Sequence, residues 1–372
     1  MTDPDGPATT EPPLAPEVAR AKGLRPGWTT GTCASAAAKA AALWLTTGEP
    51  PAEVEVGLPG GRRVSFAVTD LDPSRPHRCA VVKDAGDDPD VTNGAHITAE
   101  VAYAPAGGEG ISLRGGEGVG TITLPGLGLE VGAPAINPVP ARMIRAAVAE
   151  VTDRPVVVTI SVPGGAAMAA RTSNARLGIV GGISILGTTG VVKPFSTAAW
   201  RASVVQQVDV AAAQGQGHMV LSTGSRTDAF AQRRFPGLPP VCFVEVGDFT
   251  GIALRRVAHH HLERITFVGM AGKITKLAAG VLMTHYRRSK VDGELMAEVA
   301  RASAAPQAVI DAATATATAR HFTEVCLQCG HRAPLDELCR RAAAACRAHA
   351  GDSLAVEVLM TDFEGTELIA RG

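Results

Sequence analysis

Four apolar stretches in the second half of the chain each end in glycine, and this repeated pattern constrains the fold more than any other feature. The stretches are Ile183 to Gly187, Met219 to Gly224, Val241 to Gly247 and Ile265 to Gly269. A helix is expected after each of them, over Ser196 to Ala213, Arg226 to Arg234, Thr250 to Leu262 and Lys273 to Gly280. Alternating strands and helices are typical of a parallel sheet, whose ligand crevice lies beyond the carboxyl ends of the strands. The sequence therefore predicts a ligand site at these glycine turns; a glycine that only closes strand-on-helix packing is the alternative.

The first half of the chain has a different pattern, which predicts antiparallel strands. Val54 and Val56 alternate with polar residues on one side of the turn Pro59-Gly60-Gly61, and Val64, Phe66 and Val68 alternate on the other, as in a hairpin. Further elements are expected at Cys79 to Val82 (strand), Ile97 to Ala104 (strand), Ile111 to Leu124 (hairpin), Pro138 to Val151 (helix) and Val156 to Val162 (strand). Strands segregated from helices are typical of an α+β layer.

Together these patterns predict two domains, as does the length of 372 residues. We expect an α+β N-terminal two-layer domain over residues 23–177, followed by an α/β Rossmann-like three-layer domain with a mainly parallel sheet over residues 178–372. The second domain would end in a long helical region, Glu294 to Arg347, and a strand pair around residues 354–360 and 366–370. Residues 1–22 are rich in proline and have no basic or apolar signal region, so a disordered tail is expected there.

Charge and composition argue against several classes of protein. The chain has 35 basic and 36 acidic residues and only 4% aromatic residues, whereas nucleic-acid binders usually have a basic excess and stacking aromatics. The longest alanine-rich run, Ala34 to Leu45, is interrupted by Lys39 and falls short of the roughly 20 apolar residues of a membrane span. The seven cysteines fit reduced thiols. We therefore expect a cytoplasmic enzyme without nucleic-acid or membrane partners; a homodimer is left open.

Two polar clusters in the first half carry groups that a ligand would need. Thr29, Thr30 and Thr32 precede an alanine-rich helix, so one of them is expected to cap it while the other hydroxyls and the free amides form an anion-binding mouth. Between Lys83 and Gly94, four aspartates lie within seven residues, which requires solvent, a cation or a proton. A solvated turn is the plainer interpretation, because the run lacks the spacing of a calcium loop.

The histidines and the C-terminal cysteines raise the question of a metal. Cys326, Cys329 and His331 have a zinc-like spacing, but no second pair of ligands accompanies them, and plain helix cysteines are the alternative. His259 to His261 are adjacent on a predicted helix, where successive side chains point about 100° apart and do not converge on one ion. No protein-bound metal is expected.

Five blocks of the sequence resemble the signature blocks of the CbiD family. They are LRPGWTTGTCASAAAKAA at 24–41, KDAGDDPDVTNG at 83–94, AINPVPARMI at 135–144, GGISILGTTGVVKPFS at 181–196 and VGDFTGIAL at 246–254. The blocks come in the order of the family and span most of the chain. Three positions depart from the family pattern: Trp28 stands where Tyr is usual, Asn93 where His is frequent and Asp248 where Asn is common.

The resemblance implies an S-adenosylmethionine-dependent methyltransferase of anaerobic cobalamin (vitamin B12) biosynthesis. Its reaction would transfer a methyl group to carbon 1 of the tetrapyrrole cobalt-precorrin-5B and give cobalt-precorrin-6A, with the cobalt belonging to the substrate. Displacement of a sulfonium methyl by an electron-rich ring carbon depends mainly on alignment, which can supply roughly 7 to 11 kcal/mol. Positioning residues are therefore expected rather than a nucleophile.

On this resemblance, the front domain would hold the tetrapyrrole and the second domain the methyl donor. The cations and hydroxyls expected to meet the substrate carboxylates are Arg25, Thr29, Thr30, Thr32, Lys83 and Lys193. The carboxylates expected to take a proton or to steady positive charge on the ring are Asp84, Asp87 and Asp88. The residues expected to contact S-adenosylmethionine, with Glu245 or Asp248 accepting from the ribose, are Gly187, Thr188, Thr189, Gly190, Ser222, Thr223, Gly224, Glu245, Gly247, Asp248, Gly251, Gly269, Gly272 and Lys273.

Two other functions are the alternatives, and the first of them would use the same crevice. A phosphate- or nicotinamide-using enzyme is one, although the chain has no GxxxxGK[ST] loop and no complete GxGxxG after a strand. A corrinoid carrier is the other, with His96, His218 or His285 as the cobalt ligand. If the crevice binds the adenosyl group, Gly187→Val is expected to abolish cofactor binding and to leave the fold largely intact.

Overall fold

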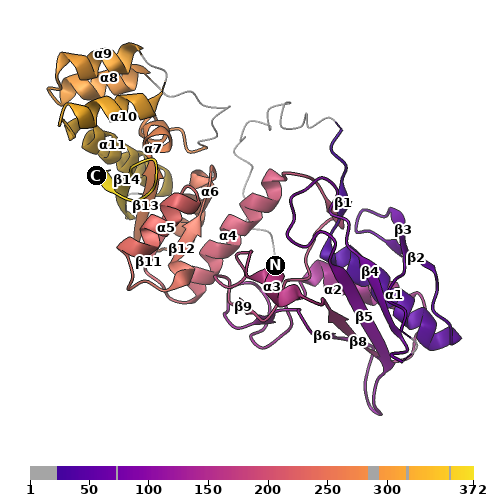
Figure 1. Ribbon diagram of the computed structural model, residues 1–372. Coiled ribbons are helices and arrows are strands. Elements are labelled where there is room, and N and C mark those ends of the chain that lie inside the picture. The colour runs from indigo at the N-terminus through magenta and orange to yellow at the C-terminus, as the bar shows by residue number, and fades with distance from the viewer. Residues whose placement is uncertain (1–22, 73, 284–292, 316–317, 352) are drawn as a thin grey trace. The chain divides into compact units, whose positions relative to one another are not determined.

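The computed structural model describes residues 23–72, 74–283, 293–315, 318–351 and 353–372 (Figure 1). The predicted tail, residues 1–22, and His285 lie outside these residues. The chain divides into two compact units, each assembled from separate segments of sequence. The first unit contains the chain up to Glu117 together with Ile136–Pro163 and Ile185–Ser196, and the second contains Gly118–Ala135, Gly164–Ser184 and Thr197–Gly372.

The first unit is built around one alanine-rich helix, α1 (Thr30–Thr47), which packs on a four-stranded sheet and on α2 (Pro138–Ala149). The sheet has the order β4 (Arg78–Val82), β5 (His96–Tyr103), β8 (Val156–Ser161) and β6 (Ile111–Gly115). A two-stranded pair, β1 (Gly27–Trp28) and β10 (Val191–Val192), lies at the start of α1. Ala34, Ala37 and Ala41 are fully buried, because side chains this small let α1 approach its neighbours closely.

The predicted hairpin is present as β2 (Glu53–Gly57) and β3 (Arg63–Ala67), which pair antiparallel. Along both strands buried residues alternate with exposed ones. Val56 faces Val64 across the pair, and both side chains are buried. The period of two in the sequence is therefore confirmed as one buried face and one solvated face.

The predicted hairpin over Ile111 to Leu124 is wrong. Only β6 forms at its start, and β6 pairs parallel with β8. The short strand β7 (Thr121–Ile122) pairs antiparallel with β9 (Ile179–Val180), in the second unit. Alternation along a strand shows which face is buried but does not select the partner strand, and here each half of the expected hairpin has a distant partner.

The second unit contains a five-stranded sheet of order β12 (Phe243–Glu245), β11 (His218–Ser222), β13 (Arg264–Met270), β14 (Ala355–Thr361) and β15 (Leu368–Arg371). The first four strands pair parallel and β15 pairs antiparallel with β14. The helices that follow the strands in sequence are α5 (Ser225–Arg234), α6 (Thr250–His259) and α7 (Ala271–Ala278), and α4 (Thr197–Ala213) precedes them. The protein is thus a mixed α/β structure with a parallel sheet, as predicted.

The predicted long helical region consists of four helices: α8 (Gly293–Ala302), α9 (Gln307–Ala315), α10 (Ala319–Gln328) and α11 (Ala333–Ala350). Two shorter elements, α3 (Gly165–Ala169) and the 3₁₀ helix η1 (Pro240–Cys242), complete the second unit. Helix α11 packs against β14 and α7. The predicted C-terminal strand pair is present as β14 and β15.

The division into units differs from the predicted boundary at residues 177 and 178. Ile122, Leu177 and Ile179 are buried in the same hydrophobic core as Val208 and Leu221. Residues 118–135 and 164–184 therefore pack with the second unit, although strands of the first unit flank them in sequence. Burial against a common core, rather than order along the chain, decides the membership of these segments.

The apolar stretch from Ile183 to Leu186 does not form the predicted strand. Ile183 makes an isolated bridge to Val119, and Ile185 makes one to Ile136. The two isoleucines belong to different units, so the chain passes from one unit to the other within this stretch. Ile183 and Ile185 are buried as predicted, whereas Leu186 is exposed. Buried irregular backbone has the same apolar composition as a short strand.

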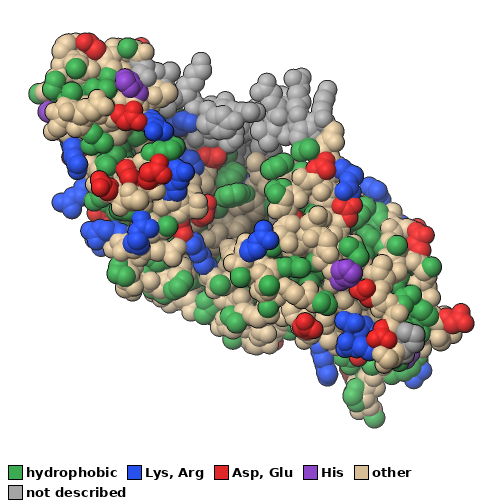
Figure 2. All heavy atoms as spheres, in the orientation of Figure 1, with side chains coloured by type: hydrophobic (Ala, Val, Ile, Leu, Met, Phe, Trp, Pro, Cys, Tyr) green, Lys and Arg blue, Asp and Glu red, His purple; other side chains and the backbone are tan. Residues whose placement is uncertain are grey.

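The surface carries both signs of charge. Figure 2 shows Lys and Arg side chains interspersed with Asp and Glu on the visible face, in keeping with a net charge of −1. Across the described ranges, we find no helix that combines the length and the apolar character needed to cross a membrane.

Candidate functional site

The carboxyl ends of β11, β12 and β13 lie at one edge of the second unit's sheet. Ser222, the last residue of β11, is level with Glu245 of β12 and Val268 of β13. The chain runs from β11 to β12 on one side and then to β13 on the other, so the strand order reverses beside β11. Ligand crevices of open α/β sheets lie at such a reversal. Three of the four predicted glycine turns therefore meet at this edge, which we call the β11–β13 edge.

Lys273, on the first turn of α7, joins the loops of the β11–β13 edge. Its ammonium group donates hydrogen bonds to the carbonyl oxygens of Thr223 (3.0 Å) and Gly247 (2.9 Å). It also forms an ion pair with Asp248, with 3.2 Å between Nζ and Oδ1. One side chain thus fixes the loop after β11 and the loop after β12 to the start of α7, which gives the edge a defined shape.

A buried carboxylate, Asp228 of α5, stabilises the β11–β13 edge through hydrogen bonds. It is 4% exposed and accepts hydrogen bonds from Arg176 (3.1 and 2.5 Å), Ser222 Oγ (3.2 Å) and Gln232 (2.6 Å). Ser222 is fully buried and its hydroxyl belongs to this network. The Ser222 side chain is therefore not exposed for the predicted contact with the cofactor. The sequence alone did not single out Arg176 and Asp228, because no local sequence pattern links residues that lie 52 positions apart.

Glu245 stands at the end of β12 and is half-buried. Burial raises the pKa of its carboxyl group, and the negative charge of Asp228 raises it further, whereas Arg176 and Lys273 lower it. A carboxyl group in this setting can accept hydrogen bonds when ionised and donate one when protonated. It is suited to a ligand with adjacent hydroxyl groups.

Two backbone amides just before α5 are already engaged by a side chain of that helix. The hydroxyl of Thr227 accepts hydrogen bonds from the amides of Thr223 (3.0 Å) and Gly224 (3.1 Å). The glycines of this edge also differ from one another. A Cβ at Gly269 would lie 2.9 Å from the Phe267 ring, and Gly251 is buried in α6, whereas nothing lies within 4 Å of a Cβ at Gly272. Gly272 therefore has open space beside it, as does Gly224.

The turn from Gly187 to Gly190 lies in the first unit, on the start of α1. Thr30 Oγ1 accepts from the Leu186 amide (2.9 Å), and Thr32 Oγ1 donates to the Gly190 carbonyl (2.7 Å). Thr29 caps α1 as predicted, accepting from the Thr32 amide (3.2 Å). All three threonines are buried. Their hydroxyls are engaged in holding this turn, which differs from the predicted anion-binding mouth.

The aspartate-rich run is organised by ion pairs and backbone amides. Lys83, only 2% exposed, donates to Asp90 (2.7 Å). Arg25 binds Asp84 through both terminal nitrogens, one at 2.9 Å, and its hydrogen bond lowers the pKa of the Asp84 carboxyl. Asp87 accepts from the Arg25 amide (2.6 Å). Each of these carboxylates has a hydrogen-bonding partner within the first unit, so the run stabilises the fold as well as forming a polar surface.

The other predicted contact residues of the first unit, Asp88, Lys193, Thr188 and Thr189, are half-buried or exposed. Asp88 accepts from the Phe195 amide (2.8 Å), which ties the aspartate-rich run to the segment that carries Lys193. Lys193, Thr188 and Thr189 are exposed, and Thr189 Oγ1 donates to the Val191 carbonyl (3.1 Å).

The cysteines and histidines do not gather at a metal site within the ranges described. No group of three or more His, Cys, Asp or Glu side chains there has the arrangement to hold an ion. Cys326 is buried in the hydrophobic core while Cys329 is exposed, and His331 Nε2 lies 3.1 Å from the Ser303 carbonyl oxygen. The zinc-like spacing therefore joins one thiol in the core of α10 to one exposed thiol at the end of that helix.

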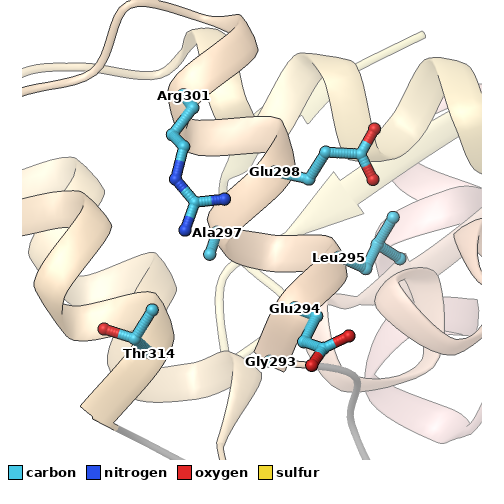
Figure 3. A pocket seen from close by; sticks show the side chains of 7 residues that line it. All are labelled: Gly293, Glu294, Leu295, Ala297, Glu298, Arg301 and Thr314. Atoms are coloured by element: carbon cyan, nitrogen blue, oxygen red, sulfur yellow. The ribbon is translucent and has the colours of Figure 1, made fainter.

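Helix α8 lines a cavity of about 880 Å³ together with Thr314 of α9 (Figure 3). Its charged residues are Glu294, Glu298 and Arg301. Glu298 forms an ion pair with Arg341 of α11 (3.0 Å). None of the predicted ligand contacts lines this cavity.

The parallel pairing of β12, β11, β13 and β14, with a reversal of strand order beside β11, places the second unit among open α/β sheets. Two family models match the chain: CbiD over residues 17–194 and the CbiD C-terminal domain over residues 283–372. The chain belongs to the CbiD family, which confirms the resemblance of the five sequence blocks.

Curated relatives are similar to this chain over nearly its whole length. A Salinispora arenicola protein named cobalt-precorrin-5B C(1)-methyltransferase is 56% identical over 98% of this chain and 97% of its own length. A Rubrobacter xylanophilus protein of the same name is 54% identical over 96% of this chain and 94% of its own length. The crystal structure of a cobalamin biosynthesis protein (cbiD) from Archaeoglobus fulgidus is 32% identical, covers 70% of this chain and 81% of that chain, and has a TM-score of 0.39.

Proposed function

We propose that this chain is an S-adenosylmethionine-dependent methyltransferase that methylates carbon 1 of cobalt-precorrin-5B in cobalamin biosynthesis, giving cobalt-precorrin-6A. The observation that carries the proposal is the 56% identity, over 98% of the chain, to a relative named for this reaction. Similarity of this extent includes both units, so it supports the same pair of ligands as well as the same fold.

The proposed donor site is the β11–β13 edge of the second unit, taken as a Rossmann-like three-layer domain. Glu245 can accept from the ribose hydroxyls, and the open space at Gly272 leaves room for a ligand beside the first turn of α7. Lys273 and Asp228 hold the surrounding loops in place. Bound at this edge, S-adenosylmethionine supplies a methyl group on a sulfonium centre. Thr223, Gly224, Gly247 and Asp248 remain proposed neighbours of the donor.

The first unit is proposed to bind the tetrapyrrole. Exposed Lys193, Thr188 and Thr189 can meet its peripheral carboxylates. The Arg25 side chain is 59% exposed and keeps Asp84 ionised at neutral pH, which favours support of positive charge on the ring over uptake of a proton. Lys83 and the threonines at the start of α1 are left out of the proposed contacts, because they are buried and hold neighbouring backbone.

Alignment is the chain's proposed contribution to the rate. Holding two reactants in an in-line geometry is worth roughly 7 to 11 kcal/mol, so no covalent step on a protein side chain is required. Loops tied by Lys273 and a first unit held by the ion pair between Lys83 and Asp90 provide the rigidity that such alignment needs.

The proposal is tested by incubating the purified protein with cobalt-precorrin-5B and S-adenosylmethionine that carries a labelled methyl group. Mass spectrometry is expected to find the label on carbon 1 of the tetrapyrrole, together with S-adenosylhomocysteine. Binding of both ligands without transfer of the label would contradict the proposed reaction.

The donor site is tested separately by calorimetric titration with S-adenosylhomocysteine. Glu245→Gln is expected to weaken binding roughly tenfold or more, since it removes a charged hydrogen-bond acceptor. Glu364→Gln, at an exposed residue of the same unit, is the matched control and should bind like the unchanged protein. Equal affinities for the two variants would show that the donor does not contact Glu245.

A further inference from the structure

Trp200 is exposed to an unusual degree for its size. It lies on the first turn of α4 and is 48% exposed, whereas Trp44 of the first unit is 8% exposed. Burial of a large aromatic side chain is favourable at about 25 cal/mol per Å² of apolar surface, so leaving an indole half in water forgoes stability. An exposed aromatic beside a ligand crevice is therefore a candidate for contact with that ligand.

The indole lies directly against the loop that follows β12. A Cβ at Gly247 would stand 3.2 to 3.3 Å from three atoms of the indole: Cζ2, Cε2 and Nε1. Gly247 also has a φ of +56°, in the left-handed region. Both observations favour glycine at this position, because a side chain there would be strained and would push against the ring. The loop after β12 and the indole of Trp200 therefore lie in close contact.

That relation extends to the β11–β13 edge. The carbonyl of the same residue, Gly247, accepts from Lys273 (2.9 Å), which fixes the loops after β11 and β12 to the start of α7. Glu245, the proposed acceptor for the ribose, is two residues before Gly247. The exposed part of Trp200 is thus held next to the end of β12, where the base of a nucleoside would follow its ribose.

We infer that Trp200 stacks on the adenine ring of the methyl donor. The inference rests on the proposed function, which supplies the adenosyl group, and adds the residue that recognises its base. Stacking suits an indole and a purine because both are flat and bicyclic and pack face to face with an offset. Trp200 is a binding residue in this account and takes no part in the methyl transfer.

Intrinsic fluorescence provides a readout that a purely structural role would not change. The chain has three tryptophans, of which Trp28 and Trp44 belong to the first unit. Titration with S-adenosylhomocysteine, and with adenosine as a probe of the base alone, is expected to quench the emission of the unchanged protein. Trp200→Phe should lose the quench and keep most of the affinity, because phenylalanine still stacks. Trp28→Phe is the matched control and should keep the quench.

Affinity is measured in parallel by calorimetry. Trp200→Ala is expected to weaken S-adenosylhomocysteine binding roughly tenfold, the effect of removing one base-stacking side chain. If S-adenosylhomocysteine binds the unchanged protein, but Trp200→Ala binds equally well or the quench persists in Trp200→Phe, the stacking role is refuted and the proposed function is unaffected. If the unchanged protein binds no S-adenosylhomocysteine, the proposed function fails and the stacking role fails with it.

Discussion

Substitution of Gly187 distinguishes two roles for the turn at residues 187–190: binding of the cofactor and stabilisation of the first unit. The resemblance assigned this glycine to the cofactor, so that a side chain there would abolish binding and spare the fold. In the structure Gly187 has a φ of +129°, and an added Cβ would lie 2.4 to 2.5 Å from three side-chain atoms of Thr29, the residue that caps α1. We therefore expect Gly187→Ala to destabilise the first unit and to leave donor binding unchanged.

The magnitude follows from two costs. A side chain held in a sparsely populated backbone conformation costs of order 1–3 kcal/mol. Overpacking against Thr29 adds about 1–3 kcal/mol. Gly94→Ala is the matched control in the same unit, with a φ of +76° and nothing within 4 Å of the added Cβ, so only the backbone cost of roughly 1–2 kcal/mol applies.

Scanning calorimetry measures the difference. Each kcal/mol lowers the Tm of a unit of this size by about 2–4 °C, so Gly187→Ala should melt several degrees below Gly94→Ala. Titration with S-adenosylhomocysteine should give the same affinity for both variants. The reasoning is refuted if the two variants melt together, or if Gly187→Ala keeps the original Tm and loses the ligand.

Three further predictions concern charge and metal. Lys83→Met should destabilise the first unit by about 3–5 kcal/mol in denaturant titrations, because it leaves Asp90 uncompensated beside the core; full stability would show that the pair is not a brace. The hydrogen bond from Arg63 lowers the pKa of the Glu150 carboxyl to about 2. The stabilisation that ionised Glu150 provides is therefore complete above its unfolded pKa of roughly 4.3, and it is lost as the pH falls towards 2. Glu150→Gln should therefore flatten the acid limb of a plot of Tm against pH, and an unchanged limb would assign that loss to other groups. Cys329→Ser should alter neither the zinc content measured by elemental analysis nor the Tm, since this thiol is exposed; a loss of bound zinc would restore the zinc interpretation.

Much of the local structure could be predicted from the sequence. The alternation of Val54 and Val56 against Val64 and Phe66 predicted the β2–β3 hairpin, and the apolar runs ending in glycine predicted β11, β12 and β13 with a helix after each. These features follow from periodicity and turn chemistry, which depend on residues close together in the chain. The sequence blocks also identified the family, because they are long, specific and in order.

Only the tertiary structure decided which groups meet. Lys273 reaches carbonyls 50 and 26 residues away, and Arg176 reaches Asp228 across 52 residues. The Gly187 turn packs on the start of α1 in the first unit, and Lys83 turns inward to Asp90. Local pattern shows that a residue lies on a turn or a strand, but its burial and its partners depend on segments brought together from distant parts of the chain.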